Sequence, residues 1–314
     1  MKFKEVAQEW LEVVHVKEVK NATYIRYKGI VLQRLNPRFG EMEIDKITKR
    51  EIQLFVSELT DSISERTHNQ LSASSVRIVV AVLKLIFNYA YDYEITNSVP
   101  TQRIKQPKPY RQDKYKVFTR DEQIELEKLV RETNDDSNYG IILALYTGMR
   151  LGEVCALNWD DIDFDEGLLN VTKTYSILRS KNDDGQLWYY ELIPPKTQTS
   201  TRVIPLPPYI LEDLKAMKER SVTPFIFNEG GVKRMHPKTL RWRLVNLLER
   251  NEKRVLSFHA LRHTFATRAV EEGMDIKTLA AVLGHANAST TLNIYSHEIL
   301  SHTKEVMRAF PKIQ

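Results

Sequence analysis

The first hundred residues repeat apolar side chains at the spacing of amphipathic helices. Apolar residues recur every three or four positions from Phe3 to Val14, from Tyr24 to Leu35, and in residues 48–59 and 74–93, which places them on one face of each helix. A T-x-x-E capping box opens the third of these segments. Four amphipathic helices with few strand signals predict a small helical bundle over residues 1–100.

The composition changes in residues 101–116, TQRIKQPKPYRQDKYK, which are basic and interrupted by Pro107 and Pro109. Because proline disfavours a helix, we predict an extended, basic interdomain linker here. A solvated tether and a linker that follows DNA phosphates both remain open, and the concentrated charge supports the second at least as strongly as the first. The linker residues predicted to bind DNA are Arg103, Lys105, Lys108 and Arg111.

Helical periodicity resumes after the linker. It begins with a second capping box, Thr119 to Glu122, and returns from Tyr139 to Tyr146. Turn residues and strand formers occupy residues 162–206, and the pattern after Pro208 is mostly helical again. We therefore predict a second domain over residues 117–314. The predicted fold class is mainly α with a small antiparallel β-sheet, an α+β arrangement.

Composition limits the kind of protein this is. The 314 residues carry a net charge of +5, a pI near 9.0 and 42% hydrophobic residues, which suits folded domains and is compatible with nucleic acid as a partner. Cys155 is the only cysteine, so we expect no intrachain disulfide and a reducing compartment. The N-terminus lacks the apolar region of a signal peptide, and the apolar stretch of residues 79–86 is too short to span a bilayer. We expect a soluble, cytoplasmic protein with no membrane partner.

Candidate chemistry lies in four separated segments. Taken singly, each has a plain structural interpretation as a surface ion pair, an exposed lysine, a solvated helix face or a core tyrosine. The segments are TGMRLGE with Arg150 and Glu153, PPKTQTSTR with Lys196, HALRHTFAT with His259 and Arg262, and LGHANASTTLNIYSH with His285 and Tyr295.

A metal site is one alternative for the third segment. His259 and His263 stand at the i, i+4 spacing of a zinc-binding helix, but Ala260 replaces the glutamate that follows the first histidine in that motif. We therefore predict no metal. The sequence has neither a P-loop nor a G-x-G-x-x-G fingerprint, so we predict no cofactor of the nucleotide class.

Together the four segments fit metal-free attack on a phosphodiester. Arginine neutralises the phosphate charge and forks onto two of its oxygens. Tyrosine forms covalent intermediates, and lysine and histidine supply or move protons. In their order along the chain, these residues and their contexts resemble the tyrosine recombinase, or phage integrase, family. The resemblance covers the whole chain, with a helical core-binding domain in residues 1–100 and a catalytic domain in residues 117–314.

The resemblance implies a role for each candidate residue and a set of partners. The partners are double-stranded DNA, three further copies of the chain in a homo-tetramer on two DNA sites, and accessory DNA-bending or directionality proteins. Position 285 is histidine, where some members have tryptophan. The implied roles are Arg150 and Arg262 on the scissile phosphate, Lys196 as general acid for the leaving 5′ oxygen, His259 and His285 in proton transfer, Glu153 in support of the site, and Tyr295 as the nucleophile that forms a 3′-phosphotyrosyl link.

A second basic group surrounds the sequence MHPKTLRWR. By charge and by its place in the family, we expect it to contact the DNA backbone, and we expect Trp242 to pack in the core. The basic residues are Lys233, Arg234, Lys238, Arg241 and Arg243.

Several functions remain open at this point. The leading interpretation is the integrase of a phage or conjugative element, which the TTLNIYSH ending and the long strand region favour. An Xer-type chromosome-dimer resolvase is the alternative within the family. A non-catalytic DNA-binding regulator and a type IB topoisomerase are alternatives from other classes, and the intact residue set argues against the regulator. Helical periodicity begins at Phe3, so we do not expect this chain to carry the arm-type domain of many integrases.

Overall fold

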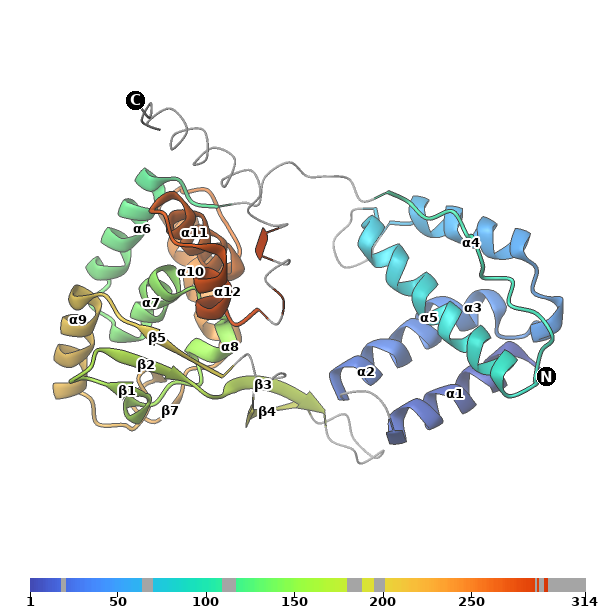
Figure 1. Cartoon of the computed structure of the whole chain (residues 1–314), viewed down its shortest axis with the longest axis horizontal. Coiled ribbons are helices and arrows are strands. Elements are labelled where there is room, and N and C mark those ends of the chain that lie inside the picture. Colours follow the sequence, from blue (N-terminus) through green and yellow to red (C-terminus); the bar gives the residue numbers. More distant parts are fainter. Residues whose placement is uncertain are drawn as a thin grey trace, which may run out of the picture. The chain divides into compact units, whose positions relative to one another are not determined.

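The computed structural model describes residues 1–17, 21–63, 70–108, 117–179, 188–194, 201–285, 287, 291 and 292. The chain forms two compact units, shown in Figure 1. The first comprises Met1–Gln112 with Leu178–Leu187, and the second comprises Asp113–Ile177 with Trp188–Gln314.

The first unit is helical, as its periodicity predicted. Apolar faces pack into one core that buries Phe3, Phe39 and Phe87 completely. The capping box predicted at Thr48 is present, because its side chain accepts from the Glu51 N–H and the Glu51 carboxylate accepts from the Thr48 N–H. The elements are α1 (Phe3–Lys17), α2 (Asn21–Ile30), the π-helical turn η1 (Val31–Leu35), α3 (Asn36–Phe39), η2 (Ile44–Lys46), α4 (Lys49–Asp61) and α5 (Ala73–Asp92).

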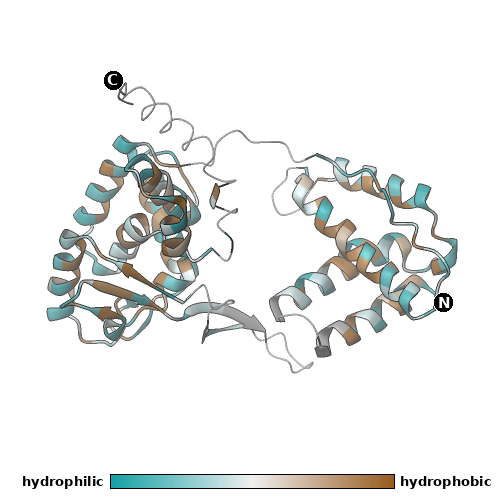
Figure 2. Cartoon of the chain, in the orientation of Figure 1, coloured by the Kyte–Doolittle hydropathy of each residue, from teal (hydrophilic) through white to brown (hydrophobic). Residues whose placement is uncertain are grey.

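Helix α5 is the most apolar element of this unit, as its brown positions in Figure 2 show. Among the described helices, it alone is long and apolar enough to cross a membrane, with a mean hydropathy of 1.5. Half of that stretch is buried inside the unit, where Val80, Leu83 and Ile86 reach the core. A core helix meets the same criteria of length and composition, and packing accounts for the character of α5.

The start of the basic segment 101–116 is attached to the first unit. Ile104 is buried in the helical core, and the backbone of Lys105 exchanges two hydrogen bonds of 2.9 and 3.0 Å with the Gln53 side chain on α4. An apolar anchor therefore lies within the segment predicted to be a linker. Residues 109–116 lie outside the described residues.

The second unit is built around α7 (Tyr139–Thr147), whose residues 139–145 are all buried. Helix α11 (Phe258–Glu271) packs along it. The capping box predicted at Thr119 begins α6, with both reciprocal hydrogen bonds present. The other helices are α6 (Arg120–Glu132), α8 (Leu151–Val154), α9 (Pro208–Glu219), α10 (Pro237–Arg250) and α12 (Ile276–Leu283), with 3-10 turns η3 (Asp136–Asn138) and η4 (Trp159–Asp161).

Short strands complete the second unit. β1 (Ile162–Asp163), β2 (Leu168–Val171) and β5 (Arg202–Pro205) form an antiparallel sheet in the order β1-β2-β5, with Leu169 opposite Ile204. β3 (Thr174–Arg179) pairs with β4 (Trp188–Ile193), and β6 (Asn228–Glu229) pairs with β7 (Lys233–Arg234). The strand-rich prediction for residues 162–206 and the mainly α fold class are therefore confirmed.

Candidate active site

The first arginine of the site lies between two helices of the TGMRLGE segment. Helix α7 ends at Gly148, which has a left-handed φ of 64°, and Arg150 is the N-cap of α8. The Arg150 guanidinium donates to Glu153 Oε1 at 2.8 Å and to the Gly284 carbonyl at 3.3 Å. Its side chain keeps 39% of its surface exposed, so part of this cation faces solvent.

Glu153 joins two arginines. Its Oε2 accepts from the Arg150 backbone N–H at 2.9 Å and from Arg202 Nη2 at 2.8 Å. Burial raises the pKa of Glu153, but the hydrogen bond and charge of Arg202, followed by the contacts of Arg150, more than offset it and the pKa is lowered overall. The carboxylate therefore stays ionised and lies among cations.

Arg262 comes from α11 and is only 3% exposed. Its Nη1 donates to the Gly148 carbonyl and its Nη2 to the Leu283 carbonyl, both at 2.8 Å. These acceptors are the C-terminal ends of α7 and α12, where the helix dipole and its unpaired carbonyls favour a positive charge. The fold thereby fixes the plane of this guanidinium.

Three consecutive carbonyls at the end of α12 accept from three different arginines. The Val282 carbonyl accepts from Arg202 Nε at 2.5 Å, and the next two carbonyls accept from Arg262 and Arg150 as described above. Gly284 ends α12 in a left-handed conformation with φ of 67°. Segments that are far apart in sequence therefore meet at one helix end.

The surroundings of the site's histidines favour their neutral form. Burial first, and then the charge of Arg262 and Arg150, lowers the pKa of His259 and lowers that of His285 to about 4. The pKa of His263 is also lowered to about 4, by burial and then by His259. The rings of His259 and His263 meet edge to face with centroids 4.7 Å apart, and His285 Nδ1 lies 2.7 Å from Thr291 Oγ1.

The structure thus brings together four of the six predicted catalytic residues and Glu153. The other two, Lys196 and Tyr295, lie outside the described residues. Arg202 and Thr291 are additional members that the sequence interpretation did not single out. Within the described part of the chain, no group of three His, Cys, Asp or Glu side chains is placed to hold a metal.

The predicted DNA-binding residues differ in their surroundings. Within the first unit, the described linker residues Arg103, Lys105 and Lys108 are exposed, and Arg111 lies outside the described residues. Near α10, Lys238 and Arg241 are exposed, and Lys233 pairs with Glu229 at 3.1 Å. The remaining two have acceptors within the protein: Arg234 donates to the carbonyls of Cys155 and Leu157 and to Asn158, and Arg243 donates to Asp135 and Asn138.

The expectation that Trp242 packs in the core is wrong, because its side chain is 60% exposed. Leu240 and Leu244 on the same helix are fully buried. With 3.6 residues per turn, a position two residues from each of them falls on the opposite side of α10. Trp242 therefore shares the exposed side of α10 with Arg241 and Lys238.

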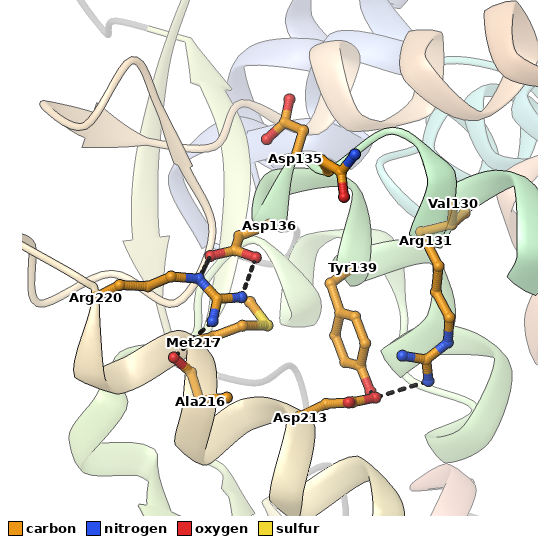
Figure 3. Close-up of a pocket in the computed structure, with 10 residues that line it drawn as sticks. Val130, Arg131, Asp135, Asp136, Tyr139, Asp213, Ala216, Met217 and Arg220 are labelled. Carbon is orange, nitrogen blue, oxygen red and sulfur yellow. Dashed lines mark hydrogen bonds and ion pairs between the residues drawn. The ribbon is translucent and has the colours of Figure 1, made fainter.

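A cavity in the second unit is lined by residues other than those of this arginine cluster. It has a volume of about 720 Å³ and lies between α6, η3 and α9 (Figure 3). Its two arginines bind carboxylates of the same lining: Arg220 binds both oxygens of Asp136, and Asp213 accepts from Arg131 and Tyr139. Its lining holds three carboxylates (Asp135, Asp136 and Asp213) against the two arginines Arg131 and Arg220, so the cavity offers no comparable phosphate clamp.

Comparison with known families agrees with the motifs. A family model described as the phage integrase family matches residues 119–302, and another, described as the N-terminal SAM-like domain of phage integrases, matches residues 2–60. The chain belongs to the phage integrase family. Its assignment as a tyrosine-type DNA recombinase, an enzyme that cleaves and rejoins DNA, is thereby confirmed.

Known members of the phage integrase family resemble this chain over most of its length. It is 29% identical to the tyrosine recombinase XerC-like protein of Caldanaerobacter subterraneus subsp. tengcongensis, over 92% of this chain and 78% of that protein. It is 27% identical to the ICEBs1 integrase of Bacillus subtilis, over 90% of this chain and 76% of that protein. The structure of the Tn1549 transposon integrase in complex with a circular intermediate DNA matches with a TM-score of 0.78 at 20% identity, over 98% of this chain and 99% of that one. At that identity, the likeness shows the shared integrase fold.

Proposed function

We propose that this phage integrase is the recombinase of a mobile genetic element and integrates and excises its DNA through Tyr295. The observation that carries the proposal is the convergence of Arg150 and Arg262 on the end of α12, directly before His285. His259 lies close enough to both arginines for their charge to lower its pKa. Fixed guanidiniums offset the charge that repels a nucleophile from a phosphodiester. Arg150 and Arg262 would supply the charge neutralisation that cleavage without a metal requires.

The proposed reaction forms one bond to phosphorus and breaks another. The Tyr295 oxygen attacks the scissile phosphorus and loses its proton to a neutral histidine, since His259 and His285 have lowered pKa values. The bond from phosphorus to the 5′ oxygen breaks, and Lys196 protonates that oxygen. Attack by another 5′ hydroxyl reverses these steps, so the phosphodiester energy is retained and rejoining needs no ATP.

A nicked suicide substrate tests the nucleophile. The native chain should form a covalent protein–DNA adduct, and Tyr295→Phe should form none while its affinity for DNA is retained. Tyr209→Phe is a matched control, because this exposed tyrosine lies on α9. An adduct with Tyr295→Phe, or none with the native chain, would contradict the proposal.

An Xer-type resolvase is the second candidate, because the relatives carry both Xer and integrase names. Plasmid recombination separates the two. We expect exchange between attachment sequences taken from the DNA next to the gene. Exchange only at a chromosome-dimer resolution site would favour the Xer function.

We extend the proposal to the assembly and its location. Four protomers would act on two double-stranded DNA sites in the cytoplasm, with DNA-bending or directionality proteins as further partners. The exposed Lys238 and Arg241, together with the basic residues between 103 and 111, are the proposed phosphate contacts. The mass of the complex on a four-way junction measures the number of protomers, and a mass of one or two protomers would contradict this assembly.

A further inference from the structure

A third arginine lies behind the two proposed phosphate ligands. Arg202 is the first residue of β5, and its side chain is 5% exposed, against 39% for Arg150. Its Nη2 binds Glu153 and its Nε binds the Val282 carbonyl. Gly284 packs closely against Arg202, since a Cβ there would lie 3.2 Å from Arg202 Nη1.

We propose that Arg202 is a positioning residue for DNA cleavage, which joins the Arg150–Glu153 pair on α8 to the C-terminus of α12. The inference rests on the proposed function of this site. Arg202 does not touch the substrate in this scheme. It acts through Glu153, which orients Arg150, and through the helix end that precedes His285.

The energetics of the buried pair favour a positioning role over simple stabilisation. Arg202 and Glu153 are both almost fully buried, and taking two charges out of water costs about as much as their attraction returns. A buried ion pair is therefore weak evidence for stability. It does fix geometry, because a guanidinium that is bound at both Nε and Nη2 cannot rotate without losing a partner.

The end of α12 accepts hydrogen bonds from three arginines. A helix leaves its last four carbonyls without intrahelical partners. Here the carbonyls of its last two residues and of the Gly284 cap accept from arginines of β5, α11 and the start of α8. If Arg202 is removed, the Val282 carbonyl loses its donor and Glu153 loses one of its two cations. The helix end is then held by Arg262 and Arg150, the residues whose positions matter for the reaction.

The charge of Arg202 has a second consequence in the same place. It is one of the positive charges that, after burial, lower the pKa of His285; the others are Arg262 and Arg150, and His259 adds a small contribution. His285 also contacts Thr291 Oγ1. An arginine behind the helix end thus contributes to keeping this imidazole neutral.

The test separates DNA cleavage from DNA binding in the 314-residue chain. Arg202→Gln should reduce the single-turnover rate of adduct formation at saturating suicide substrate by about 10²-fold, the scale of an ångström misplacement in a site. Affinity for the same DNA should change by less than about threefold, because Arg202 makes no DNA contact in this scheme. Arg202→Lys keeps the charge but cannot bridge Glu153 and Val282, and it should not restore the rate.

Two control variants test whether the loss of cleavage is specific to the bridge between Glu153 and the end of α12. Arg268→Gln removes a largely buried arginine that also binds one carboxylate and one carbonyl, those of Glu271 and Phe118, and it should cleave at the native rate. Combining Arg202→Gln with Glu153→Gln should cost little more than either change alone, since both act on the same bridge.

A folded Arg202→Gln or Arg202→Lys protein that cleaves at the native rate would overturn the inference. Additive losses with Glu153→Gln would also overturn it. If both Arg202 variants fail to fold, as judged by thermal melting, Arg202 is a residue of the core and the positioning role is rejected. Absence of adduct from the native chain would instead reject the proposed function, so the two failures are distinguishable.

Discussion

The Arg262 guanidinium spans two carbonyls, those of Gly148 and Leu283. An ammonium group is a single point donor and cannot hold both. We expect Arg262→Lys to lose about 10²–10³ in single-turnover cleavage rate, nearly as much as Arg262→Ala. Arg268→Lys, on the same helix, is the control. Native cleavage by Arg262→Lys would show that charge alone suffices.

Protonation of the half-buried histidines His263 and His285 should destabilise the fold. His263 and His285 have pKa values lowered to about 4 from the usual 6.5, so between these values the unfolded chain binds protons that the folded chain does not. The free energy of unfolding should be highest above pH 7 and should fall as the pH drops from 6.5 towards 4. Denaturant titrations at pH 7.5 and 5.5 measure the change, and His285→Asn should reduce it. Equal stability at both pH values would contradict the assigned shifts.

At single residues, the sequence indicated some members of the candidate site and missed others. The order and local context of the motifs indicated Arg150, Arg262 and the histidines. The alternation of strand β5 could also have indicated Arg202. Arg202 is the missed residue. It alternates with Ile204 along β5, and both are buried, so strand spacing placed an arginine on the inward face. Trp242 is the opposite case: its size suggested the core, and its helical position two residues from Leu240 excludes it.

At the scale of elements, substitution of Gly148 at the left-handed end of α7 tests how tightly the second unit packs there. Gly148 and Gly230 share a φ of 64°, so alanine strains both backbones by about 1–2 kcal/mol. At Gly148 a Cβ would also lie 2.6 Å from Phe265 and 2.7 Å from Leu283, whereas at Gly230 nothing lies within 4 Å. Gly148→Ala should therefore lower the free energy of unfolding by about 1–3 kcal/mol more than Gly230→Ala. Equal losses in denaturant titrations would show that the site yields to the added methyl group.

Elements with strong local signals were predicted well. Both capping boxes begin helices at the expected residues, Thr48 and Thr119, because their hydrogen bonds are local in sequence. The hairpin of β6 and β7 was missed, since its strands have two residues each and offer no alternation to detect. Ile104 was overlooked because basic composition dominated its segment, although the first unit buries it.

At the scale of the whole molecule, the basic segment between the units can be tested through salt dependence. Each phosphate contact contributes about 0.9 to the slope of log affinity against log salt. Changing Lys105, Lys108 and Arg111 to Gln should reduce the slope by up to about 3 units. The affinities for specific and for random DNA should fall by similar factors. Titration at several salt concentrations measures this.

A variant of equal net charge is the control for that experiment. An unchanged slope in the linker variant would identify a solvated tether, and an equal loss in the control would indicate a general charge effect. The control changes lysines of the second unit to Gln: Lys128, Lys215 and Lys253.

The end of α12, which three arginines share, limits which segments can be exchanged between family members to make chimeric proteins. The helix begins at its cap, Asp275, and ends at Gly284. One inserted residue in this interval would turn the last carbonyls by about 100° about the helix axis, away from Arg150, Arg202 and Arg262 together. Chimeras should therefore tolerate altered side chains on the outer face of α12 but no altered length. The turn at Gly230 and Gly231, where a Cβ on either glycine would meet nothing within 4 Å, should accept insertions.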